Sequence, residues 1–142
     1  MKRRNALSGA RAEYLFAPRV VDVACLISDA VGDCMCIRGD RIGDRWRVTE
    51  ADPFDEAKMP AVGILLSKLT PTTGEMQILG PCDLFTGLDW ASPGYFVGAS
   101  GITDTAPAPA PGGWVLVQHI GKPVADDLLL LTGENILVKR RG

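Results

Sequence analysis

The side chains best suited to chemistry in this chain are four cysteines and a single histidine. Thiolate and imidazole groups are the usual ligands of zinc, and Cys34 and Cys36 stand two residues apart, with Cys25, Cys82 and His119 elsewhere. Residues two apart on a β-strand point to the same face of the sheet, and the Cys-x2-Cys spacing of common zinc modules is absent. We therefore interpret Cys34 and Cys36 as small apolar side chains in a packed layer, and we expect no metal and no cofactor.

A nucleophilic enzyme needs a base and an orienting group beside its nucleophile. His119 is one possible base for four thiols, and it alternates with apolar residues, which is typical of a structural or interface side chain. Asp22, Asp29 and Asp33 are assigned to turns, where Asp usually hydrogen-bonds the backbone. The cell-adhesion tripeptide at residues 38–40, Arg-Gly-Asp, coincides with the expected end of a strand and is interpreted as a turn. We expect no catalytic residues and no enzymatic activity.

Charge divides the 142 residues into a basic start and an acidic body. The length suits one domain, and 46% hydrophobic with 23% charged residues is ordinary globular usage. The first nineteen residues lack strand periodicity and interleave basic with apolar side chains, so we expect an extended arm at 1–19 and a β-domain at 20–142. The arm residues predicted to contact a partner are Lys2, Arg3, Arg4, Leu7, Arg11, Tyr14, Leu15, Phe16 and Arg19.

The β-domain is predicted from its turns. Gly, Pro and Asp signals recur at roughly 8 to 12 residues, and no long helical periodicity interrupts them, which is typical of sandwiches and barrels. Residues 61–68 and 75–79 read as a hairpin across the Pro and Gly of 71–74. We expect a further strand at 82–88. The alternating Ala and Pro of 106–113 predict a stiff extended loop. The fold class is all-β.

An ordered set of short motifs runs through residues 32–138. It includes Met-Pro-Ala-Val-Gly-Ile at 59–64, Ser-Pro-Gly-Tyr-Phe-Val at 92–97, and Val-Gln-His-Ile-Gly at 117–121 behind the proline-rich loop. This order resembles the β-domain of phage head decoration and head-fibre proteins. The resemblance implies a compact, partly closed β-barrel of the tulip type, assembled as a homotrimer and used as a virion structural protein.

Two functions of different class follow from that resemblance. The first is a capsid decoration, or cement, protein on the exterior of a phage or gene transfer agent head, whose arm binds the major capsid protein. The alternative is the base or shaft of a head fibre, spike or tail protein that takes part in host-surface binding. The chain has neither the apolar run of a secretory signal nor that of a membrane span. We expect synthesis in the host bacterial cytoplasm, free thiols, and neither a membrane nor a specific nucleic acid as partner.

Overall fold

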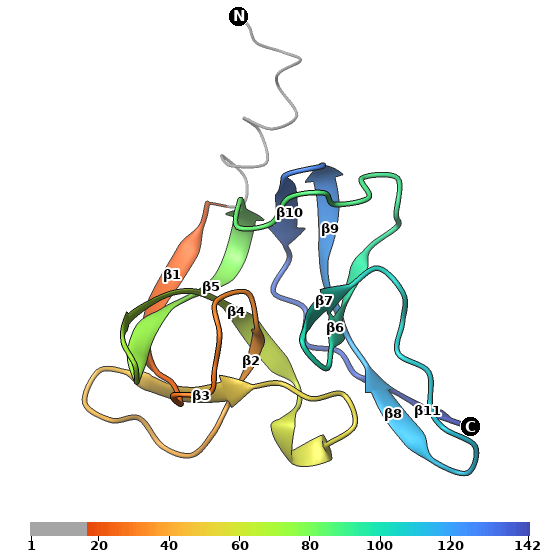
Figure 1. Cartoon of the computed structure of the whole chain (residues 1–142), viewed down its shortest axis with the longest axis horizontal. Coiled ribbons are helices and arrows are strands. Elements are labelled where there is room, and N and C mark those ends of the chain that lie inside the picture. Colours follow the sequence, from red (N-terminus) through yellow and green to blue (C-terminus); the bar gives the residue numbers. More distant parts are fainter. Residues whose placement is uncertain (1–16) are drawn as a thin grey trace, which may run out of the picture.

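A computed structural model describes residues 17–142, and nearly all of its regular structure is β-strand (Figure 1). Strand accounts for 50% and helix for 2%, which confirms the all-β prediction. In chain order the elements are β1 (Arg19–Ala24), β2 (Cys34–Ile37), β3 (Trp46–Glu50), the 3-10 turn η1 (Glu56–Lys58), β4 (Ala61–Thr70), β5 (Thr73–Cys82), β6 (Tyr95–Gly98), β7 (Gly101–Thr103), β8 (Trp114–Val117), β9 (His119–Ala125), β10 (Leu128–Leu131) and β11 (Val138–Arg141).

Strands β1 to β5 form a closed five-stranded barrel in the order β1-β3-β2-β4-β5. The barrel closes because β1 also pairs antiparallel with β5, from Arg19 opposite Leu79 to Ala24 opposite Thr73. Strands β1 and β3 run parallel, with Val23 opposite Trp46. The barrel that we expected to be partly closed is therefore closed in this structure.

The predicted hairpin is confirmed and is longer than expected. Strands β4 and β5 pair antiparallel up to Thr70 opposite Thr73, so the turn itself is Pro71 and Thr72. Gly74 lies against the partner strand, where an added Cβ would overlap the carbonyl oxygen of Ser67. The glycine is thus required for close approach of the two strands.

Two apolar cores lie on opposite faces of the barrel wall. Val23, Met35, Val48, Leu65 and Met76 fill the barrel interior and are at most 2% exposed. Cys34 and Cys36 flank Met35 on β2 and point outward, into a second core shared with the other strands. Period-2 alternation explains this split, and it confirms that Cys34 and Cys36 share one face.

The second core lies between the barrel and a layer made of β10, β9, β6 and β7 (Figure 1). Strand β5 belongs to both layers, because its first part pairs with β1 and β4 while residues 80–82 pair with β10. The change of partner occurs at Gly80, whose φ of +91° is a conformation that favours glycine. One long strand thereby joins the two halves of the molecule.

The expected strand at residues 82–88 is wrong. Strand β5 ends at Cys82, and the next strand, β6, begins at Tyr95. Leu88 is still buried in the second core, and its N–H donates to the carbonyl of Asp126. Apolar residues here serve a packed connection instead of a strand. The proline-rich segment 106–113 contains no strand, as predicted.

Candidate functional site

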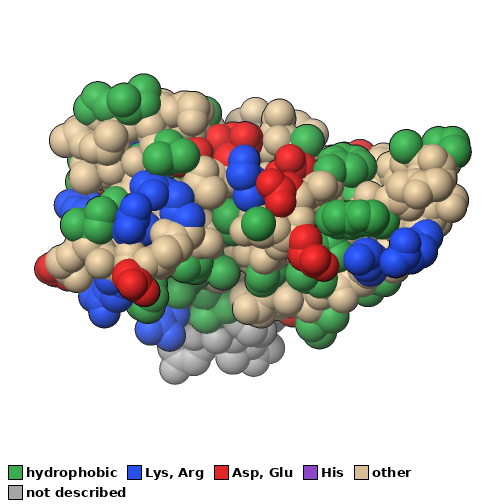
Figure 2. All heavy atoms as spheres, turned by 90° about the horizontal axis from the view of Figure 1, so that it is seen from below, with side chains coloured by type: hydrophobic (Ala, Val, Ile, Leu, Met, Phe, Trp, Pro, Cys, Tyr) green, Lys and Arg blue, Asp and Glu red, His purple; other side chains and the backbone are tan. Residues whose placement is uncertain are grey.

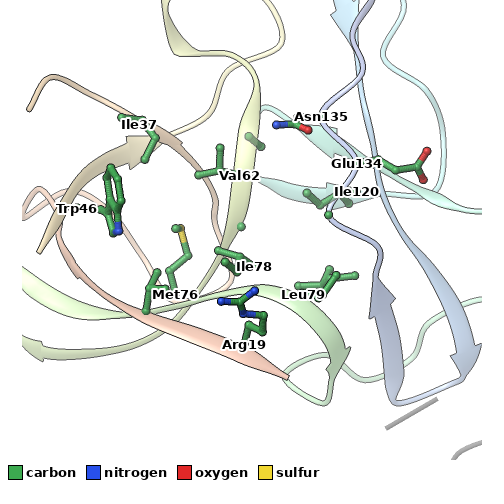
Figure 3. Close-up of a pocket in the computed structure, with 15 residues that line it drawn as sticks. Arg19, Ile37, Trp46, Val62, Met76, Ile78, Leu79, Ile120, Glu134 and Asn135 are labelled. Atoms are coloured by element: carbon green, nitrogen blue, oxygen red, sulfur yellow. The ribbon is translucent and has the colours of Figure 1, made fainter. Parts of the chain in front are cut away.

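A groove of about 460 Å³ opens at one end of the barrel (Figure 3). The starts of β1, β3 and β4 and the end of β2 meet there, as their pairing directions require. Its far wall comes from β9, β10 and the segment after β10. The lining residues are Arg19, Val21, Ile37, Trp46, Ala61, Val62, Gly63, Met76, Ile78, Leu79, Ile120, Leu131, Gly133, Glu134 and Asn135.

The floor of the groove is formed by side chains at the groove end of the barrel interior. Val21, Val62 and Ile78 line it and also pack against the buried interior residues. Ile37 and Trp46 stand on one side, opposite Glu134 and Asn135 in Figure 3, and remain 40% and 42% exposed. An apolar cavity of this size with few polar groups at its rim suits apolar side chains or an apolar ligand.

The acidic residue at the rim is held by its own neighbours. Glu134 Oε1 accepts a hydrogen bond from Thr132 Oγ1 at 2.9 Å and lies 3.8 Å from Nδ1 of His119. His119 is packed in turn, edge-on to Phe96 and directly over Gly94, where an added Cβ would overlap the imidazole. These contacts give His119 a structural place, as its apolar surroundings in the sequence predicted.

Gln118 ties the two walls of the groove together. Its side chain is fully buried, and its Oε1 accepts from the N–H of Ala61 at 2.8 Å while its Nε2 donates to the carbonyl of Ala61, also at 2.8 Å. The same Nε2 donates to the carbonyl of Glu134 at 3.1 Å. The amide thus takes the place of a neighbouring strand beside β4. We did not predict this residue; a Gln within an apolar run was the available signal.

Of the predicted partner contacts, one lies in the described part of the chain. Lys2, Arg3, Arg4, Leu7, Arg11, Tyr14, Leu15 and Phe16 lie outside the described residues. Arg19, which we assigned to the arm, is the first residue of β1 and stands opposite Leu79. Pairing with β5 thus places Arg19 within the sheet. Because Arg19 lines the groove, β1 begins at the groove rim.

The turn between β2 and β3 carries a group of arginines beside the groove. The Arg41 guanidinium lies 4.8 Å from the ring centre of Trp46, a cation–π contact. Arg38 Nε donates to the carbonyl of Val48 at 2.9 Å, and Gly39 has a φ of +70°. The Arg-Gly-Asp tripeptide therefore forms a turn whose arginine is engaged by its own barrel, as interpreted from the sequence.

The four cysteines are free thiols buried in the cores. Burial raises the pKa of each, and that of Cys34 to about 12, with the nearby Asp33 and Glu50 adding to the effect. Such thiols stay protonated at neutral pH. They act here as small apolar side chains.

The predicted role of the aspartates in turns is confirmed for two of three. Asp29 accepts from the N–H groups of Leu26 and Glu50 at 2.7 and 3.1 Å, and Asp33 accepts from the N–H of Ala30 at 2.8 Å. Asp22 differs, because it lies exposed within β1. Burial raises the pKa of Glu50, helped by the charge of Asp33.

A second basic group stands on the ribbon made by β8 and β11. All four residues of β11 are exposed, and Lys139 Nζ lies 4.8 Å from the ring centre of Trp114. Figure 2 shows Lys and Arg side chains gathered over the barrel and again toward this ribbon, with acidic and apolar side chains between them. The surface is mixed, and it carries no continuous basic face in this view.

Within residues 17–142, no three His, Cys, Asp or Glu side chains are placed to share a metal ion. In the same range, no helix is long and apolar enough to cross a membrane. Comparison with models of protein families, with curated proteins and with solved structures finds no match to this chain. The site must therefore be interpreted from its own geometry.

Proposed function

We propose that this chain is a virion structural protein that decorates the exterior of a phage or phage-like (gene transfer agent) head. Its N-terminal arm binds the major capsid protein, and three copies assemble on the shell. The observation that carries the proposal is the place where the arm joins the domain. Arg19 is both the first residue of β1 and part of the groove rim, so a basic arm and an apolar groove share one end of the barrel.

This arrangement suits attachment to a protein surface better than catalysis. Charged groups steer an encounter, and buried apolar groups supply most of the lasting affinity. Ordering an extended segment on a partner costs about 2 to 5 kcal/mol, so a single arm binds weakly. Three arms acting together raise the avidity by orders of magnitude without any new contact.

Cryo-electron microscopy tests the location. The sample is particles purified from a culture that expresses the chain. The proposal expects density for the closed barrel on the outer surface of the head, with the arm running into the shell. Density confined to a head fibre, a spike or the tail would instead support the alternative function.

Truncation tests the role of the arm. Deleting residues 2–16 leaves all of β1 and should preserve the strand signal in far-UV circular dichroism, while binding to particles made without the protein falls at least tenfold. The matched control replaces Lys139, Arg140 and Arg141 of the ribbon by Glu and should bind normally. High salt should weaken wild-type binding, since exposed charges are screened. Undiminished binding by the truncated chain would show that the β-domain itself makes the contact.

A further inference from the structure

The groove at the barrel mouth leaves apolar side chains partly exposed to solvent. Its floor is continuous with the barrel core, and Ile37 and Trp46 on its wall stay about two-fifths exposed. Small closed barrels are filled by side chains, and an open mouth is a place where further apolar groups bind. We propose that the occupant of this mouth is the chain's own segment before β1, with Tyr14 and Phe16 as the side chains that enter it.

The chain length permits this contact. Arg19 lines the groove, and Phe16 precedes it by three residues. An extended chain spans at most 3.3 to 3.6 Å per residue, so the Cα of Phe16 lies within about 11 Å of the Cα of Arg19, and that of Tyr14 within about 18 Å. Both aromatic rings therefore reach the groove without any change in β1.

The sequence before β1 favours the required geometry. Pro18 disfavours helical backbone at Ala17, which directs the chain into an extended path. Side chains two apart on an extended chain point to the same side. The spacing of Tyr14 and Phe16 therefore assigns both aromatic residues to one face of an extended path and Leu15 to the other.

The groove offers matching contacts for aromatic rings. Val62, Met76 and Ile78 line it, and Figure 3 shows Met76 and Ile78 near Arg19. A thioether such as that of Met76 makes favourable contacts with the edge of an aromatic ring, and each aromatic side chain can bury 150 to 250 Å². Aromatic rings bind to such a floor by apolar contact, so they need few polar groups at the rim.

A tethered segment also outcompetes other occupants. A short connection holds its ligand at an effective concentration near the millimolar range, which exceeds that of a second copy at micromolar protein. The inference divides the arm in two: it assigns Tyr14 and Phe16 to the groove and leaves Leu15 and the earlier basic residues for a partner. It does not depend on the capsid, and its tests use the free protein.

Photo-crosslinking of the full-length chain tests the contact. With p-benzoylphenylalanine in place of Phe16, irradiation should produce crosslinks to Val62, Met76 or Ile78 in a product of single-chain mass. The matched control carries the same probe in place of Asn5 and should give at least tenfold less of these crosslinks. Equal yields from the two probes would overturn the proposal. Products that join two chains through the same residues would assign the groove to the arm of a neighbouring copy, and would overturn it too.

A second measurement does not need a crosslink. In the full-length chain labelled with 5-fluorotryptophan, Phe16→Ser should shift the fluorine NMR signal of Trp46, identified by its loss in Trp46→Phe. The signals of Trp90 and Trp114 serve as internal controls and should stay in place, since neither residue lines the groove. Leu7→Ser should move none of the three. A Trp46 signal unchanged by Phe16→Ser, in a chain with normal circular dichroism, would overturn the proposal.

Discussion

Replacing Gln118 by Leu should destabilise this protein, because the Gln118 amide makes buried hydrogen bonds to two separate segments. The substitution keeps a side chain of similar size in a fully buried position and removes three hydrogen bonds to the backbone. Two of them satisfy the N–H and the carbonyl of Ala61, which is itself only 1% exposed. The third reaches the carbonyl of Glu134, on the opposite wall of the groove.

The expected loss follows from the groups left without partners. A buried donor or acceptor without a hydrogen bond costs about 1 to 3 kcal/mol, and Ala61 would lose both of its bonds to the amide. Added apolar burial by Leu offsets part of this, so we expect the free energy of unfolding to fall by about 2 to 4 kcal/mol. Domains of this size are stable by about 5 to 15 kcal/mol, so the variant should still fold.

Urea unfolding followed by circular dichroism measures the effect. With a slope of about 2 kcal/mol per molar urea, a loss of 3 kcal/mol lowers the midpoint by about 1.5 M. Gln77→Leu is the matched control, because Gln77 is also buried but its Nε2 donates to two carbonyls of its own strand, those of Leu79 and Pro81. We expect about 1 kcal/mol there, since an unpaired carbonyl is tolerated better than an unpaired N–H.

The result that would refute this reasoning is a Gln118→Leu midpoint equal to or above that of Gln77→Leu. The two walls of the groove would then be held together by apolar packing alone. A lower slope for Gln118→Leu would have a different meaning, because it indicates partial unfolding of one layer in place of a two-state transition.

Three further outcomes are expected. Gly63→Ala should lower the unfolding free energy in urea by about 1 to 3 kcal/mol, because the new Cβ would lie 2.5 Å from the carbonyl oxygen of Gln77; an unchanged midpoint would mean that β5 can move away. Burial raises the pKa of Cys34 from 9.0 to about 12, so as pH rises the unfolded state loses this proton before the folded state does. The free energy of unfolding should therefore fall between pH 9 and 12, and it should fall less steeply in Cys34→Ala. Parallel declines in the two proteins would contradict the raised pKa. Sedimentation velocity at micromolar concentration should show a species of about three times the 15.2 kDa chain mass, and a monomer alone would count against the trimer.

Local chemistry explains the features that the sequence could predict. Gly, Pro and Asp residues adopt turn conformations at low cost, so their positions indicate where the chain turns. The all-β class and the hairpin across residues 71–74 could therefore be predicted. The common face of Cys34 and Cys36 follows from strand periodicity alone, and the structure has it. The strand expected at 82–88 failed because apolar residues such as Leu88 also fill the core from a connection.

Long-range pairing was decided by the tertiary structure. No residue near Val23 in the sequence indicates that Trp46 is its parallel partner. Likewise, the sequence around Gly80 does not indicate that β5 changes its pairing partner from the barrel strands to β10. Closure of the barrel pairs the edges of β1 and β5, and it places Arg19 in β1 and the groove at the barrel mouth. The fold also depends on contacts such as that between Gln118 and Ala61, which are 57 residues apart. A local sequence pattern carries no information about such distant pairs.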